Sequence, residues 1–234
     1  MEPTGDGTRV LSSGLMRFTA RQAWFDAERR LADSADSGVD AEVVSPFPPL
    51  LNYRLAAGYG RDLARWVNEY VAHLCAAAPG RIYGLGTVPL QEPDLAAGEL
   101  ADVAQAGLAG VEIASNVGGV SLGDPRFCEF FAEAERLGTA IFVHAMPAAS
   151  DRLPGPAAAT FGVGIEGALA AAALVTGGVA EKYPRLRLAF SHAAGGFPLQ
   201  LPRAQWFWGR TWNEEPPGGD REAQHRPAEV ILVP

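Results

Sequence analysis

The sequence predicts an α/β protein folded as an incomplete (β/α)8 barrel of the TIM type. Short apolar, strand-like runs alternate with long helical patterns along the 234 residues. The strand-like runs lack a strict alternation of apolar and polar residues, which is typical of parallel strands covered on both faces. No GxGxxG or GxxxxGK[ST] turn follows the first run, so the pattern favours a barrel over a nucleotide-binding doubly wound sheet.

Five runs are predicted as barrel strands, because each is short, rich in apolar or β-branched residues and bounded by turn residues. A complete barrel has eight strands in about 250 residues. A barrel of five strands stays open and exposes its edges, so we expect oligomerisation or low solubility. The predicted strands are residues 41–47, 81–90, 107–115, 139–145 and 186–193.

Helices are predicted where apolar residues recur at spacings of three and four and the run ends at Gly or Pro-Gly. The segment 167–180 is apolar throughout but carries a Gly pair and is shorter than the roughly 20 residues of a membrane helix. We expect it to be a buried helix and expect no membrane association. The other predicted helices are residues 25–38, 59–80, 92–107 and 124–138.

Composition divides the chain into three parts. Residues 1–20 are a polar N-terminal segment, residues 21–212 are the partial barrel domain, and residues 213–234 are a polar, Pro/Gly-rich tail ending in a candidate short strand. The opening segment lacks the basic and apolar pattern of a signal peptide. Cys75 and Cys128 lack CxxC spacing and are expected to be reduced packing residues, so the expected location is the cytoplasm.

The charge of the chain argues against a nucleic-acid partner. The formal net charge is -8 and the isoelectric point is about 5.0. The arginines are scattered, so no basic stripe is available to follow a phosphate backbone. We therefore expect a small-molecule ligand and no nucleic acid.

Two of the four histidines end neighbouring predicted strands, His144 in TAIFVHA and His192 in LRLAFSHA. In a parallel barrel the carboxyl ends of the strands meet at one rim, which is where catalytic groups lie. A neutral imidazole can bind a metal ion, and a second one can exchange a proton near pH 7. The small residues after His192 are expected to leave room for a substrate or an ordered water. The alternative is two core histidines that are hydrogen-bonded to the backbone.

The other conspicuous aromatic and imidazole side chains favour structural roles. His73 lies within a predicted helix and His225 in the polar tail, and neither shows ligand spacing. The run WFWGRTW at 206–212 has aromatic residues at helical spacing, which is more typical of a core or a subunit interface than of a ligand site.

The segment 21–212 resembles the decarboxylase branch of the amidohydrolase superfamily, most closely its aminocarboxymuconate-semialdehyde decarboxylases. FVH followed by SHAAGGFP is the most specific part of the likeness, and Arg203 lies at the expected distance beyond it. The matching segments are DAERRLADSADSGVDAEVVSPFP, RIYGLGTVPLQEPDLAAGEL, GLAGVEIAS, AERLGTAIFVHAMP and GGVAEKYPRLRLAFSHAAGGFP.

The resemblance implies a distorted (β/α)8 barrel that holds one zinc ion. By the resemblance, His144 is a zinc ligand and His192 is the acid/base that activates metal-bound water. It also implies that Arg21 and Arg203 bind a substrate carboxylate, with Arg203 supplied by the neighbouring subunit of a homodimer. These roles agree with the chemistry of zinc and of guanidinium groups.

The sequence departs from the family pattern at both ends. Family members have a first strand ending in His-x-His and a last strand with an aspartate in Gly-(Ser/Thr)-Asp-Tyr-Pro, and this sequence contains neither. Zinc sites use three or four protein ligands, so His144 and His192 alone form an incomplete site. His144 is followed by Ala-Met-Pro where the family has Pro-Trp, which predicts a different substrate pocket.

The predicted function is a metal-dependent decarboxylase, a carbon–carbon lyase that acts on a small unsaturated or aromatic carboxylic acid. A hydrolase or hydratase on the same scaffold is an alternative, because a fold does not fix its chemistry. A protein of a different class is also compatible with the missing ligands. In that case the chain is a non-catalytic barrel remnant that acts as a binding or interaction subunit.

Overall fold

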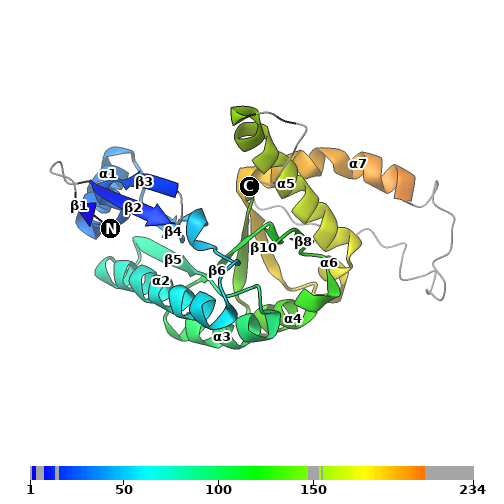
Figure 1. Cartoon of the computed structure of the whole chain (residues 1–234), viewed down its shortest axis with the longest axis horizontal. Coiled ribbons are helices and arrows are strands. Elements are labelled where there is room, and N and C mark those ends of the chain that lie inside the picture. Colours follow the sequence, from blue (N-terminus) through cyan, green and yellow to red (C-terminus); the bar gives the residue numbers. More distant parts are fainter. Residues whose placement is uncertain (1, 4–7, 14–15, 147–152, 154, 209–234) are drawn as a thin grey trace.

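The computed structural model describes residues 2–3, 8–13, 16–146, 153 and 155–208. Its main feature is a five-stranded parallel sheet with helices packed on one face (Figure 1). The strands lie side by side in chain order: β4 (Glu42–Val44), β5 (Ile82–Gly86), β6 (Gly110–Ala114), β9 (Ala140–His144) and β10 (Arg187–Phe190).

The strand order confirms the barrel prediction. Each strand of this sheet pairs in parallel with the next of its strands along the chain. Across the described strands, each new strand therefore lies at the same edge of the sheet. A doubly wound sheet would reverse at a switch point. All five strands fall within their predicted ranges, and among the described strands β4 and β10 are the two edges of the sheet.

The connections between the strands are helices, as predicted. Local signals set their ends: Pro93 and Pro156 each stand in the first turn of a helix, and Gly138, with φ of +66°, ends another in the left-handed conformation. The helices are α1 (Ala27–Asp36), α2 (Ala57–Ala77), α3 (Pro93–Gln105), α4 (Cys128–Leu137), α5 (Pro156–Thr176), α6 (Val179–Lys182) and α7 (Phe197–Trp208).

The core lies between the sheet and helices α2, α3 and α4, which line one side of it (Figure 1). Alternate strand residues face these helices and are at most 6% exposed. The opposite face of the sheet, which is the inner face of a barrel, is only partly covered: Val43 is 62% and Tyr83 is 49% exposed. The helix-facing strand residues are Val44, Ile82, Val111, Ile113, Ile141 and Val143.

The polar N-terminal segment forms a small antiparallel sheet that the sequence analysis did not predict. It contains β1 (Glu2–Pro3), β2 (Arg9–Ser13) and β3 (Met16–Ala20). Phe18 of β3 packs edge-on against Phe47, which follows β4, with ring centroids 4.7 Å apart. This contact fastens the small sheet to the β4 end of the large one (Figure 1). The polar tail 213–234 lies outside the described residues.

Several short elements connect the strands and helices. A two-stranded hairpin of β7 (Asn116–Val117) and β8 (Val120–Ser121) follows β6. The 3-10 turns are η1 (Gln22–Trp24), η2 (Pro48–Leu50), η3 (Pro125–Phe127) and η4 (Ser191–Gly196).

Helix α5 is longer and more exposed than the buried helix predicted over 167–180. One side packs into the protein through Ala170 and Leu174, whereas Phe161, Ile165 and Leu169 are 65%, 44% and 57% exposed. Among the described helices, α5 alone has the length and apolar character to cross a membrane. The mean hydropathy of its most apolar segment is 1.7, and 35% of that segment is buried within the protein. The exposed residues recur every four positions, so they form one apolar stripe.

Candidate active site

His144 and His192 lie together at the carboxyl edge of the sheet. His144 is the last residue of β9, and His192 follows β10 after one intervening residue. Their ring centroids are 6.1 Å apart and their planes cross at 83°. His144 is 25% exposed in its side chain, and His192 is exposed. The predicted meeting of the two imidazoles is therefore present, on a rim open to a ligand.

His192 opens a left-handed turn. His192, Ala193 and Ala194 have φ values of +53°, +51° and +49°, and Gly195 continues the turn at +57°. The left-handed conformation costs an L-residue about 1–2 kcal/mol, so such residues persist only where the surrounding structure holds them. Ser191 contributes at the start of the turn, because its Oγ accepts a hydrogen bond from the backbone N–H of Ala145 at 2.9 Å.

The turn is held by close packing against helix α5. Ala194 is fully buried. A Cβ on Gly195 would lie 1.6 Å from the carbonyl oxygen of Gly164, and a Cβ on Gly167 would lie 3.3 Å from the nitrogen of Gly195. The small residues at 194 and 195 thus allow two backbones to touch. This differs from the expectation that they leave space for a substrate.

Glu112 is a site residue that the sequence analysis missed. It is fully buried on β6, and its Oε1 lies 2.7 Å from Nδ1 of His144. Among the described residues, neither carboxylate oxygen of Glu112 nor Nδ1 of His144 makes a hydrogen bond of regular geometry, with each other or with another group. The available signal was a single acidic residue in the otherwise apolar run GLAGVEIAS, because a buried carboxylate needs a partner.

Tyr53 lies behind Glu112. Its hydroxyl oxygen accepts a hydrogen bond from the backbone N–H of Ala114 at 3.3 Å. Burial raises the pKa of the Tyr53 phenol, and the negative charge of Glu112 raises it further. The phenol therefore stays neutral near pH 7, which avoids a second negative charge beside the Glu112 carboxylate.

A second buried glutamate ties α5 to the rim. Glu166 Oε2 accepts hydrogen bonds from Asn116 Nδ2 at 3.0 Å and from Ser115 Oγ at 3.4 Å. Ser115 Oγ in turn accepts from the backbone N–H of Met146 at 3.1 Å. These bonds connect the loops after β6 and β9 with α5 and so fix the edge on which His144 lies.

The two predicted arginines lie on different elements. Arg21 is exposed and directly follows β3, at the β4 end of the sheet. Arg203 is exposed on α7, the helix that follows the turn of His192. His73 is exposed on α2. His225 and residues 209–212 of the aromatic run lie outside the described part of the chain.

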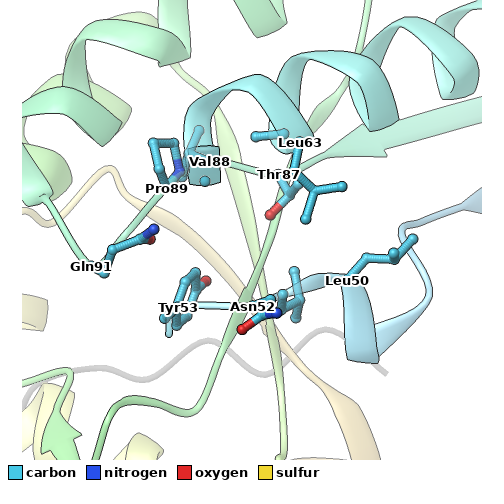
Figure 2. Close-up of a pocket in the computed structure, with 11 residues that line it drawn as sticks. Leu50, Asn52, Tyr53, Leu63, Thr87, Val88, Pro89 and Gln91 are labelled. Atoms are coloured by element: carbon cyan, nitrogen blue, oxygen red, sulfur yellow. The ribbon is translucent and has the colours of Figure 1, made fainter. Parts of the chain in front are cut away.

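A small hollow lies between the loops that follow β4 and β5 and the start of α2 (Figure 2). Asn52, Tyr53, Thr87 and Gln91 give it polar walls, and Gln91 Nε2 donates a hydrogen bond to the carbonyl oxygen of Leu55 at 3.2 Å. Its volume is about 10 Å³, which is room for about one water molecule. An aromatic acid therefore does not fit there.

The residues present fit part of a metal site. The nearest carboxylate to His144 lies behind its Nδ1, which leaves Nε2 to face a metal ion, and His192 offers a second imidazole. Among the described residues, no group of three or more His, Cys, Asp or Glu side chains could hold a metal ion. The described residues thus supply nitrogen donors of the right chemistry for a divalent cation, in a number below a full site.

Comparisons with known proteins agree with the fold. The family model described as amidohydrolase matches residues 16–223. The 2-amino-3-carboxymuconate-6-semialdehyde decarboxylase of Dictyostelium discoideum is 32% identical, over 77% of this chain and 51% of its own length. The gamma-resorcylate decarboxylase of Rhodococcus jostii is 28% identical, over 86% of this chain and 68% of its own length.

Solved structures of decarboxylases also match the fold of this chain. The 5-carboxyvanillate decarboxylase of Sphingomonas paucimobilis matches with a TM-score of 0.72 and 33% identity, over 77% of this chain and 56% of that one. A 5-carboxyvanillate decarboxylase of Novosphingobium aromaticivorans, with bound manganese, matches with a TM-score of 0.72 and 27% identity, over 77% and 54% of the two chains. The chain thus spans about half the length of the first relatives that it matches. The match over residues 16–223, together with the strand order and the paired histidines, shows that the chain belongs to the amidohydrolase family.

Proposed function

We propose that this chain is a metal-dependent decarboxylase that acts on a small aromatic or unsaturated carboxylic acid. The observation that carries the proposal is the meeting of His144 and His192 at the carboxyl edge of the sheet, with ring centroids 6.1 Å apart. Support comes from relatives and structural neighbours that are decarboxylases of resorcylate, carboxyvanillate and an aminocarboxymuconate semialdehyde.

His144 would hold the metal ion through Nε2, and His192 offers a second imidazole beside it. Zinc is the metal implied by the resemblance, and manganese is bound in one neighbour, so the proposal includes both cations. When bound, a divalent cation polarises substrate oxygens and withdraws electron density from the bond to the carboxylate. The imidazole of His144 suits either cation as part of a larger ligand set.

His192 would supply the proton that decarboxylation requires. The bond between the carboxylate carbon and its neighbouring carbon breaks, carbon dioxide leaves, and the vacated carbon takes one proton from a ring nitrogen of His192. The imidazole then regains a proton from water. A group that exchanges protons near pH 7 suits both steps. The left-handed turn holds the His192 backbone at the rim, where a ligand can reach it.

Arg21 and Arg203 are proposed to bind the substrate carboxylate, because a guanidinium group can hold a carboxylate through two parallel hydrogen bonds. Both are exposed. Arg203 would act in the site of a second copy, so the proposal includes a homodimer. The apolar stripe on α5 and the exposed Leu199 of α7 offer the surface that such a dimer would bury. A cytoplasmic location is part of the same proposal.

A non-catalytic role as an interaction subunit is the second candidate. One observation favours it: the described residues bring no third ligand to His144 and His192. The two candidates differ in whether the purified chain binds a metal ion and releases carbon dioxide.

The test combines metal content with carbon dioxide release, and 2,6-dihydroxybenzoate and 5-carboxyvanillate serve as substrates. We expect about one zinc or manganese ion per chain in the parent, and its loss in His144→Ala. His192→Asn, in which asparagine tolerates the left-handed backbone, should keep the metal and lose about 10²-fold or more of the rate. His73→Ala on α2 is the control and should match the parent. A parent chain without metal and without carbon dioxide release would establish the interaction-subunit candidate instead.

A further inference from the structure

We propose that Glu112 is a positioning residue: its carboxylate accepts a hydrogen bond from a protonated Nδ1 of His144 and thereby leaves Nε2 unprotonated and free to bind a cation. The inference rests on the proposed function, in which His144 is a metal ligand. It adds a residue that neither the resemblance nor the comparisons assign.

Burial and distance point to this pairing. Glu112 is 0% exposed, and its Oε1 lies 2.7 Å from Nδ1 of His144. At this separation the lone pairs of an unprotonated nitrogen and an ionised oxygen would repel, so a proton belongs between them. Within the described part of the chain, neither carboxylate oxygen of Glu112 nor Nδ1 of His144 makes a hydrogen bond of regular geometry, with each other or with another group. A buried carboxylate without a donor is strongly disfavoured, so the Nδ1 proton is the donor that Glu112 requires at this distance.

The strand register explains why the two side chains meet. His144 pairs with Ala114 across β9 and β6, and Glu112 lies two residues before Ala114. Because successive side chains alternate between faces, Glu112 and His144 point to the same face of the sheet. The rings of Phe142 and His192 each lie 6.1 Å from the His144 ring at steep angles. Glu112 adds the polar contact that selects which ring nitrogen carries the proton.

A purely structural role would give Glu112 a different partner. Glu99, another buried glutamate, receives two hydrogen bonds from Arg65, at 2.7 and 2.9 Å, and so links α3 to α2. Glu112 makes no ion pair with Lys or Arg within the described residues; the group it faces is an imidazole. Metal-binding histidines commonly donate their second N–H to a carboxylate, which fixes the tautomer and strengthens binding.

The first test reads the tautomer directly, in the metal-free full chain. Nitrogen-15 NMR of histidine-labelled protein reports which ring nitrogen is protonated, and His144→Gln identifies the signals of His144. We expect protonated Nδ1 and unprotonated Nε2 in the parent. Glu112→Gln keeps an acceptor oxygen and should keep this tautomer, whereas Glu112→Leu should give a mixture. Glu99→Gln is the matched control at a buried glutamate and should leave the signals unchanged.

The second test measures zinc and manganese affinity by calorimetry on the same variants. Glu112→Leu should weaken binding by about 10- to 100-fold, and Glu112→Gln should restore part of the loss. Parent protein with protonated Nε2, or a Glu112→Leu variant with parent-like tautomer and affinity, would overturn the inference. If the tautomer responds to Glu112 but the parent binds no metal, the positioning role stands and the proposed function fails.

Discussion

At the scale of single residues, the left-handed turn after β10 shows how the site is held in shape. Three consecutive non-glycine residues, His192 to Ala194, adopt a conformation that L-residues avoid. The strain is offset by the buried contact of Ala194 and by the approach of Gly195 to the backbone of α5. The conformation of His192 therefore depends on a helix that lies before it in the chain.

Replacing Gly195 with alanine should destabilise the protein strongly. The new Cβ would meet the carbonyl oxygen of Gly164 at 1.6 Å, and φ is +57°, so we expect a loss of about 3 kcal/mol or more in the free energy of unfolding. Gly196→Ala is the matched control. It has φ of +79° but only Leu199 Cδ1 nearby at 4.0 Å, and it should cost about 1 kcal/mol.

Urea denaturation of the two variants beside the parent provides the measurement. Equal losses for Gly195→Ala and Gly196→Ala would show that backbone conformation, rather than contact with α5, decides the stability of the turn.

The sequence predicted the two histidines but not their surroundings, for a physical reason. His144 and His192 could be found because strand ends are visible in the apolar pattern and parallel strands share one rim. Glu112 reaches His144 across two strands, and no local pattern records which side chains become diagonal neighbours. The turn is also invisible locally, because alanine has no preference for positive φ.

At the scale of elements, local capping chemistry sets where α1 begins. The carboxylate of Asp26, the residue before α1, accepts a hydrogen bond from the backbone N–H of Arg29 at 3.0 Å. This bond, together with one from the Gln22 side chain, lowers the pKa of Asp26 below its ordinary value of 3.8. The stabilising effect of the cap therefore depends on the charge of Asp26.

The cap predicts a pH-dependent contribution to stability. Because the pKa of Asp26 is lower in the folded protein than in the unfolded chain, its contribution is fully present above pH 3.8 and is lost as pH falls through the lowered value. Asp26→Ala should lower Tm at pH 7, and the difference from the parent should shrink below pH 4. Asp26→Asn retains a capping oxygen, so its Tm should exceed that of Asp26→Ala at pH 7. Calorimetric scans from pH 3 to 7 measure both; a difference between parent and Asp26→Ala that does not change with pH would contradict the role of the charge.

Elements with a strong apolar period were predictable, and elements fixed by distant contacts were not. Strands β4 to β6, β9 and β10 and helices α1, α3 and α4 fall within their predicted ranges, and α2 begins two residues before its predicted start at Tyr59. The antiparallel sheet of β1, β2 and β3 was not predicted, because its sequence is polar and its anchor is the packing of Phe18 on Phe47. Helix α5 begins before its predicted start, since small residues alone do not mark a boundary.

At the scale of the whole molecule, helices α5 and α7, which precede and follow β10 in the chain, carry exposed apolar side chains. Phe161, Ile165 and Leu169 form the stripe on α5, and Leu199 of α7 is 84% exposed. Apolar patches of this kind mark association surfaces more often than free surface. Because α7 also carries Arg203, association through these helices would bring that arginine to a subunit boundary.

The proposed dimer predicts that a charge placed in the apolar stripe of α5 lowers the molecular mass measured in solution. Leu169→Glu places a charge in the middle of the stripe, where the parent side chain is 57% exposed, so the fold should persist while a dimer dissociates to the monomer mass. Trp66→Glu on α2, at a position that is 59% exposed, is the control and should remain dimeric. Light scattering coupled to size-exclusion chromatography gives the masses. A parent chain that is monomeric at every concentration would exclude the dimer.

The order of the strands has a consequence for how the chain folds. Each strand of the large sheet pairs with the strand that precedes it in the sheet order, so a new strand always meets a partner that has already been synthesised. The paired strands are therefore closer in sequence than they would be in a sheet whose central strands come last in the chain. A short sequence separation between contacting residues favours rapid folding. The sheet can thus grow at one edge during translation, from β4 toward β10. The pair of histidines forms when β10 docks on β9 and the turn of His192 closes against α5.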